Sequence, residues 1–285
     1  MSESQVDSPV VSTKSEPAPV RRSRWSRFSP SMGWKAFWSE IVIVVLGVAI
    51  ALAASEAVEN WNWRNKVADG EARLRQETAL AFAYSAERYA IAPCVDARLV
   101  ALIGKVMDSG ERLDPVTIHT SLGIRRVLNS PQRPFRFSIW DALVADGTAS
   151  RMSPQRQAVY SRLDDSMARM RGRMEDSSRL RGRLLVLDHP IALDDVTRNQ
   201  LLTNLEELRD MFAVDARSLG QDMDLISRED MAPAADRVED FLASASTVQF
   251  CREQGLPMND WRDVSSTLVG TSPNPHASAN SATPQ

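Results

Sequence analysis

The hydrophobic positions of this chain form one unbroken run, followed by several amphipathic segments. From Ile41 to Ala54 every residue is apolar, and the acidic residue Glu40 stands just before the run. A helix over residues 34–55 would be about 33 Å long, close to the roughly 30 Å hydrocarbon thickness of a bilayer. The pattern therefore predicts a transmembrane helix over residues 34–55.

Aromatic and charged residues flank the run in the arrangement typical of a single membrane span. Phe37 and Trp38 stand at one end, and Trp61 and Trp63 stand at the other, where amphipathic rings favour headgroup depth. Basic residues outnumber acidic residues before the run, whereas Glu56 is the first charge after it. This asymmetry predicts a cytoplasmic N-terminus.

The location follows from the absence of a second apolar run of this length. Residues 56–265 are expected beyond the membrane, which for a bacterial inner-membrane protein is the periplasm. Thirty Arg against four Lys favours a bacterial source. The alternative is an exported soluble protein with a cleaved signal, because Ala51 and Ala53 form an A-x-A pattern. The anchor is preferred because the 40 residues ahead of the run are long for a signal n-region.

The remaining chain shows the pattern of an all-α protein. Apolar residues recur at spacings of three and four, and prolines stand at junctions. We expect one N-terminal transmembrane helix followed by a helical-bundle-like exported domain. The first helix should continue until Pro93, and Ser138, Ser153 and Asp194 or Asp195 are expected helix starts. Further helices are predicted over residues 94–108, 116–128, 138–147, 154–187, 195–225 and 233–250. The two ends, residues 1–31 and 266–285, are rich in Ser and Pro and are predicted to be disordered tails.

Cys94 and Cys251 are the two cysteines of the chain, and both fall in the part expected to be exported. Proteins of oxidising compartments pair their cysteines, so we predict an intramolecular disulfide. Two unpaired buried thiols are the alternative. The cysteines have no neighbouring His or Cys that would make a zinc site.

Gly47, Ala51 and Ser55 lie four residues apart on one face of the predicted transmembrane helix. This spacing of small residues lets two membrane helices approach closely, and it predicts a homodimer through that face. The alternative is that small residues are simply common in such helices. Glu40 falls on the same face, where it would contact a partner or reach the interface.

The segment FWSEIVIVVLGVAIALAASEAVENWNWRNK carries the motif E-I-x5-G-x2-I-A-L followed by a Trp-Asn pair. Its motif residues are Glu40, Ile41, Gly47, Ile50, Ala51, Leu52, Trp61 and Asn62. It resembles the opening of a class of uncharacterised bacterial single-pass inner-membrane proteins. The resemblance covers roughly 30 of 285 residues. It implies membrane placement and a helical exported part, and it implies no activity.

Residues suited to catalysis or to cofactor binding are sparse. The three histidines, His119, His189 and His276, have no second ligand at metal-binding spacing, and no phosphate-binding glycine loop or G-x-S-x-G elbow occurs. His119, close to Asp114, is the one histidine retained as a site candidate. We therefore predict no enzyme activity, no cofactor and no metal. The exported part counts 28 basic and 33 acidic residues, a balance that argues against a nucleic-acid partner.

Two segments combine residues that bind ligands or partners. The first is a helical cluster of six arginines, which we interpret as a solvated face balanced by Glu175 and Asp176; an anion-binding face is the alternative. The six are Arg169, Arg171, Arg173, Arg179, Arg181 and Arg183. The second segment unites aromatic and charged residues around a loop. It predicts a partner or ligand groove, or else aromatic rings that fill the core beside paired arginines. The groove residues are Arg133, Phe135, Arg136, Phe137, Trp140 and Asp141.

The sequence thus favours a membrane-tethered, non-catalytic interaction or scaffold module. Its expected partners are the lipid bilayer, an unknown periplasmic protein and a second copy of the chain. An envelope sensor or small-ligand-binding accessory protein is the alternative.

Overall fold

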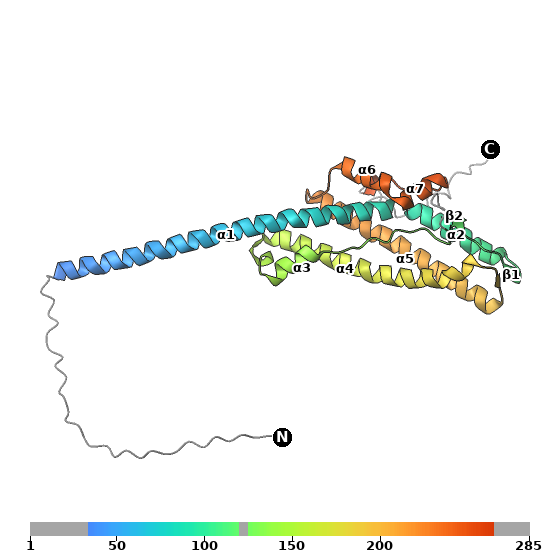
Figure 1. Cartoon of the computed structure of the whole chain (residues 1–285), viewed down its shortest axis with the longest axis horizontal. Coiled ribbons are helices and arrows are strands. Elements are labelled where there is room, and N and C mark those ends of the chain that lie inside the picture. The colour runs from blue at the N-terminus through green and yellow to red at the C-terminus, as the bar shows by residue number, and fades with distance from the viewer. Residues whose placement is uncertain (1–33, 120–124, 265–285) are drawn as a thin grey trace, which may run out of the picture. The chain divides into compact units, whose positions relative to one another are not determined.

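A computed structural model describes residues 34–119 and 125–264 of the chain, and in these ranges the fold is all-α. Seven α-helices account for most of the described residues (Figure 1). They are α1 (Trp34–Ala90), α2 (Ala92–Asp108), α3 (Ser138–Ala145), α4 (Pro154–Arg183), α5 (Asp195–Arg228), α6 (Ala235–Ser244) and α7 (Ser246–Glu253). Short 3-10 helices lie at Ala149–Arg151, Leu184–Asp188 and Trp261–Asp263.

The chain divides into two units, residues 1–58 and residues 59–285. In the first unit the described residues belong to α1, and their large apolar side chains are exposed. α1 is the one described helix that is long and apolar enough to cross a membrane, with a mean hydropathy of 2.6 and no part of its apolar window buried. A helix of this length and composition is consistent with membrane anchoring.

The second unit is built around two long antiparallel helices, α4 and α5, which lie side by side (Figure 1). α2 packs against α5, and the core between these helices contains fully buried leucines such as Leu99, Leu102 and Leu208. The apolar spacing of three and four along α2 and α5 is what places these residues on one side of each helix. The described residues of this unit therefore share one main core, and a smaller second cluster of buried side chains lies apart from it, formed by Ala81, Phe135, Met167, Met170 and Leu219.

Two described helices of this unit, α4 and α5, begin at the expected capping residues. The Ser153 hydroxyl accepts a hydrogen bond from the Arg156 backbone N–H ahead of Pro154, and the Asp194 carboxylate accepts one from Thr197. Gly147 ends the α3 region with a φ of +79°, which suits a residue without Cβ.

Ser138 differs from its predicted role. It is the first residue of α3 rather than the residue before it, and the Glu77 carboxylate of α1 accepts hydrogen bonds from the backbone N–H groups of Ser138 and Ile139. A carboxylate from a distant helix thus caps α3.

The helix predicted over residues 116–128 is wrong in the described part of that range. β2 (Ile118–His119) pairs antiparallel with β3 (Arg125–Arg126). Just before them, β1 (Arg112–Leu113) pairs antiparallel with β4 (Ile191–Ala192). Both strand pairs are two residues long, so they connect helices without altering the all-α class.

The helix predicted over residues 233–250 is in fact two helices. α6 ends at Ser244 and α7 begins at Ser246, with Ala245 in an extended conformation between them. The break redirects α7 toward the beginning of α2.

Candidate functional site

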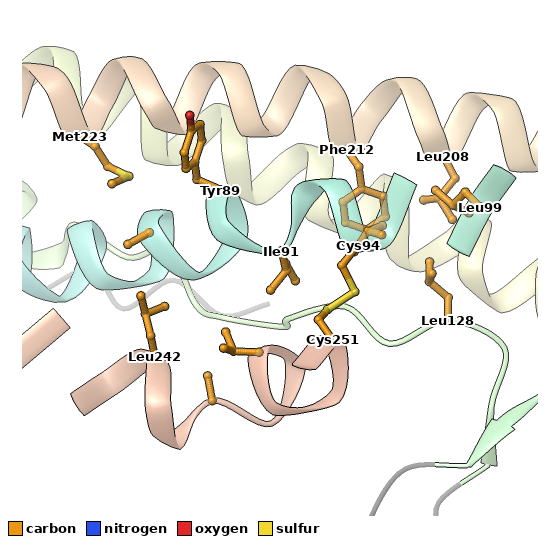
Figure 2. Close-up of a cluster of buried hydrophobic side chains, with 14 of the residues drawn as sticks. Tyr89, Ile91, Cys94, Leu99, Leu128, Leu208, Phe212, Met223, Leu242 and Cys251 are labelled. Atoms are coloured by element: carbon orange, nitrogen blue, oxygen red, sulfur yellow. A yellow bond between two sulfur atoms is a disulfide. The ribbon is translucent and has the colours of Figure 1, made fainter. Parts of the chain in front are cut away.

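The two cysteines meet where α7 approaches the first turn of α2. The sulfurs of Cys94 and Cys251 are 2.06 Å apart, at disulfide distance, and each residue is at most 2% exposed. Figure 2 shows this link beside the ring of Phe212 from α5. The prediction that the two cysteines pair is confirmed in geometry, and α7 is thereby held against the core.

A buried carboxylate on α1 connects three segments of the unit. Glu87 of α1 has no exposed surface, and it accepts hydrogen bonds from the Arg133 Nε (2.7 Å) and from the Thr247 hydroxyl of α7. The Arg133 guanidinium also lies over the rings of Tyr84 and Phe241. The hydrogen bond with Glu87 raises the pKa of Arg133. Glu87 thus holds α1, the segment before α3, and α7 together.

The neighbouring residue Arg88 is also buried, at 2% exposure. Its Nη1 donates to the Asp215 Oδ2 at 2.7 Å, and its Nη2 donates to the Pro131 carbonyl at 3.1 Å. The second Asp215 oxygen accepts a hydrogen bond of 2.5 Å from the Arg173 Nε of α4. Burial lowers the pKa of Arg88, and Asp215 partly opposes that shift.

Two groups of charges adjoin here around buried carboxylates: Glu87 pairs with Arg133, and Asp215 pairs with Arg88 and Arg173. The side chains of Arg133 and Arg173 are 33% and 24% exposed, and the charge of Glu87 also acts on Arg88. We call these five residues together the buried charge network. Both carboxylates in it are fully occupied by guanidinium or hydroxyl donors. Breaking one partner of such a pair is strongly destabilising, so the network fixes how α1, α4 and α5 pack.

The residues predicted to form a groove divide between the core and the surface. Phe135, Phe137 and Trp140 are 1%, 2% and 7% exposed, so their rings fill the core, while Arg133 belongs to the buried charge network. Arg136 and Asp141 remain exposed. A groove for a partner or ligand at these residues stays a prediction.

A hollow of about 220 Å³ does lie beside this segment. Leu80 and Tyr84 of α1 line it together with Phe135 and Arg136. Leu80 is 48% exposed, so part of the apolar wall of the hollow faces solvent. We call this hollow the Leu80 hollow.

The predicted packing face of the first unit is exposed. Gly47, Ala51 and Ser55 have no neighbours that cover them, and a Cβ at Gly47 would meet no atom within 4 Å. A homodimer through this face stays a prediction.

The arginine cluster of α4 is partly directed into the fold, which corrects the expectation of a solvated face. Arg173 pairs with Asp215, Arg171 donates to the Phe135 carbonyl at 2.8 Å, and Arg181 donates to the Ser130 hydroxyl at 2.9 Å. Arg169, Arg179 and Arg183 are exposed, as expected. Arg179 pairs with Asp176 at the surface.

The end of α4 borders a larger pocket of about 470 Å³, which we call the arginine pocket. It lies between α4 and the segment that follows β3, and its size falls within the range of small-molecule sites. Its lining includes Arg126, Gln132, Ser178, Arg181, Leu184 and Leu185.

The histidines do not form a shared site in the described residues. His119 lies in β2, His189 follows the 3-10 helix after α4, and His276 lies outside the described residues. Residues 34–119 and 125–264 contain no group of three His, Cys, Asp or Glu that could hold a metal ion.

Sequence analysis missed the charge network, although the chain carries a signal for part of it. Between Thr78 and Val95 the only charged residues are Glu87 and Arg88. Two adjacent charges in so long an uncharged stretch of a helix indicate burial with partners.

Comparisons of the chain with protein-family models, with curated proteins and with solved structures found no match. Any proposal about the function of the protein therefore rests on the geometry described above.

Proposed function

We propose that the protein is a single-pass bacterial inner-membrane protein whose residues 56–265 form a non-catalytic interaction domain in the periplasm. The observation that carries this proposal is the exposed apolar run of α1, which has a mean hydropathy of 2.6 and no buried part. An exposed apolar surface of this size on a helix is stable in lipid and costly in water.

Two further features support the orientation and the compartment. Basic residues gather before the run and acidic residues follow it, as expected for a cytoplasmic N-terminus. The cysteines stand at disulfide distance on the far side of the run, and disulfides persist in oxidising compartments. The motif that resembles single-pass inner-membrane proteins agrees with this placement.

A topology measurement tests the anchor. A periplasm-active reporter is fused after Ser265 and a cytoplasm-active reporter before Met32, and both are followed in membrane and soluble fractions. Activity of both reporters in the membrane fraction is expected. A soluble, shortened protein whose sequence starts near Ala54 would instead establish a cleaved signal and end the anchor proposal.

Site-specific photo-crosslinking tests the interaction role. A photoreactive residue at Leu80, in the Leu80 hollow, should give a discrete crosslinked protein band in cells. Val100 of α2 is the matched control because it has a similar exposure of 45%. Identical patterns at both positions would contradict a partner surface at the Leu80 hollow.

A second function, a small-ligand-binding accessory protein, is favoured by the arginine pocket. Its volume of about 470 Å³ suits a small molecule, and its walls combine guanidinium, amide, hydroxyl and leucine side chains.

A further inference from the structure

The arginine pocket contains two guanidinium groups from separate segments. Arg126 is at the end of β3, and Arg181 is in the last turn of α4. Two cations that share one pocket repel each other, and a compact fold tolerates the arrangement when an anion can lie between them.

Neither arginine has a carboxylate partner among the described residues. Arg126 donates to the Asn129 side-chain oxygen at 3.1 Å, while Arg181 donates to the Ser130 hydroxyl and to the Ser177 carbonyl. Burial lowers the pKa of Arg181, and the positive charges of Arg88 and Arg126 lower it further. Arg126 is exposed to water and Arg181 is half-buried, so the pocket holds two guanidinium charges that have no counter-ion among the described residues.

The buried charge network cannot supply the missing negative charge. Its carboxylates, Asp215 and Glu87, are taken by Arg88, Arg173 and Arg133. The network contains three arginines and two carboxylates, so it is itself positive by one charge.

Besides Gln132 and Ser178, the pocket is lined by the apolar side chains of Val127, Leu128, Leu184 and Leu185, which suit a hydrocarbon chain. Leu184 is 1% exposed and closes the inner wall, whereas Leu185 is 64% exposed. An apolar group lying on Leu185 would remove that surface from water.

We propose that the arginine pocket binds an organic anion that carries an apolar chain. Its phosphate or carboxylate lies between Arg126 and Arg181, where guanidinium forks donate paired hydrogen bonds, and its chain covers Leu184 and Leu185. This proposal rests on the second function above, and it does not depend on the membrane topology.

Calorimetric titration of the full chain tests the proposal. The protein is held in nanodiscs of zwitterionic lipid and titrated with hexyl phosphate, with empty nanodiscs as the blank. Hexyl phosphate should bind more tightly than inorganic phosphate, which lacks the chain, and hexanol, which lacks the charge, should not bind measurably.

Variants assign the binding to the pocket. Arg126→Gln and Arg181→Gln should each weaken hexyl phosphate binding about tenfold or more, because each removes a charge-assisted hydrogen bond. Arg179→Gln is the matched control, since Arg179 lies on the same helix, pairs with Asp176 and does not line the pocket. Its affinity should equal that of the wild type. Leu185→Gln, at an exposed position, should weaken hexyl phosphate and leave inorganic phosphate unchanged.

Several results would overturn the proposal. An unchanged affinity of Arg126→Gln for hexyl phosphate would show that the anion binds elsewhere. If hexanol bound as tightly as hexyl phosphate, the pocket would still bind a ligand, but the charge of the ligand would play no role. No heat above the blank would end both this inference and the second function, while the anchor proposal would stand. If hexyl phosphate binds as expected, repeating the titration in nanodiscs that contain anionic phospholipid identifies the source of the natural ligand. Competition between the phospholipid and hexyl phosphate indicates a membrane lipid, and unchanged binding of hexyl phosphate indicates a soluble anion.

Discussion

Asp215→Asn tests whether the buried charge network stabilises the fold. In the native protein each Asp215 oxygen accepts one guanidinium hydrogen bond, from Arg88 at 2.7 Å and from Arg173 at 2.5 Å. Asparagine has one acceptor oxygen and no charge, so one guanidinium loses its bond and both lose their counter-ion. Arg88 cannot compensate by reaching water because it is 2% exposed.

The expected loss of stability in Asp215→Asn follows from these contacts. A hydrogen bond to a charged group contributes roughly 1.5–3 kcal/mol, and removing one member of a buried ion pair costs about 3–5 kcal/mol. We therefore expect Asp215→Asn to lower the free energy of unfolding by about 3–5 kcal/mol. Asp176→Asn is the matched control: its pair with Arg179 is exposed, so the loss should stay below about 1 kcal/mol.

Urea unfolding of the full chain in one fixed detergent, followed by tryptophan fluorescence, measures both variants. Comparison is valid when wild type and variants share the same dependence of the free energy on urea concentration. If the free energy of unfolding of Asp215→Asn lies within about 1 kcal/mol of the wild-type value, or equals that of Asp176→Asn, the network does not stabilise the fold as argued.

Three further predictions address other parts of the molecule. The disulfide spans 157 residues, so replacing Cys94 and Cys251 by Ala should lower the free energy of unfolding by about 5 kcal/mol in the chain-entropy model; equal urea midpoints for the unreduced wild type and the double variant would contradict a disulfide. Gly47→Ile should abolish self-association in a membrane two-hybrid assay, while Ala49→Ile on the opposite face should not; an unchanged signal in Gly47→Ile would discard this face. Burial raises the pKa of Asp222, so its ionised form destabilises the native state. Asp222→Asn should thus be more stable than the wild type at pH 7, with the difference vanishing as the pH falls below the unfolded-state pKa near 4; a difference independent of pH would refute this reasoning.

Helix starts were predictable because their signals are local. Ser153 and Asp194 each cap a backbone N–H three residues ahead, so the information lies within one turn of the helix. The apolar run of α1 was equally predictable, since an unbroken apolar run needs no tertiary partner to be recognised.

Elements that depend on distant partners were not predictable. The described part of the segment after Val116 is not helical: the Val116 backbone N–H donates to the Leu187 carbonyl at 3.0 Å, and β1 pairs with β4 some 80 residues away along the chain. The spacing of apolar residues within one segment does not indicate which distant segment it pairs with. The same holds for the break at Ala245, where neither Gly nor Pro marks the end of α6.

The candidate sites also depend on contacts between distant segments, which the sequence alone does not show. The aromatic and charged residues gathered around one loop predicted that Phe135 and Trp140 would either line a groove or fill the core, and the sequence could not choose between these alternatives. The partners of Arg88 and of Arg181 come from other segments, so one sequence could not show which arginine is neutralised and which is not.

The link between Cys94 and Cys251 also sets an order of events during synthesis. Cys94 leaves the ribosome 157 residues before its partner, an interval of roughly 8–30 s at 5–20 residues per second. With two cysteines in the chain, any bond that Cys94 forms in that interval must be to another molecule. If residues 56–265 are exported as proposed, the nascent protein passes through a period in which the Cys94 thiol can form mixed disulfides with oxidising enzymes, until synthesis of α7 supplies Cys251.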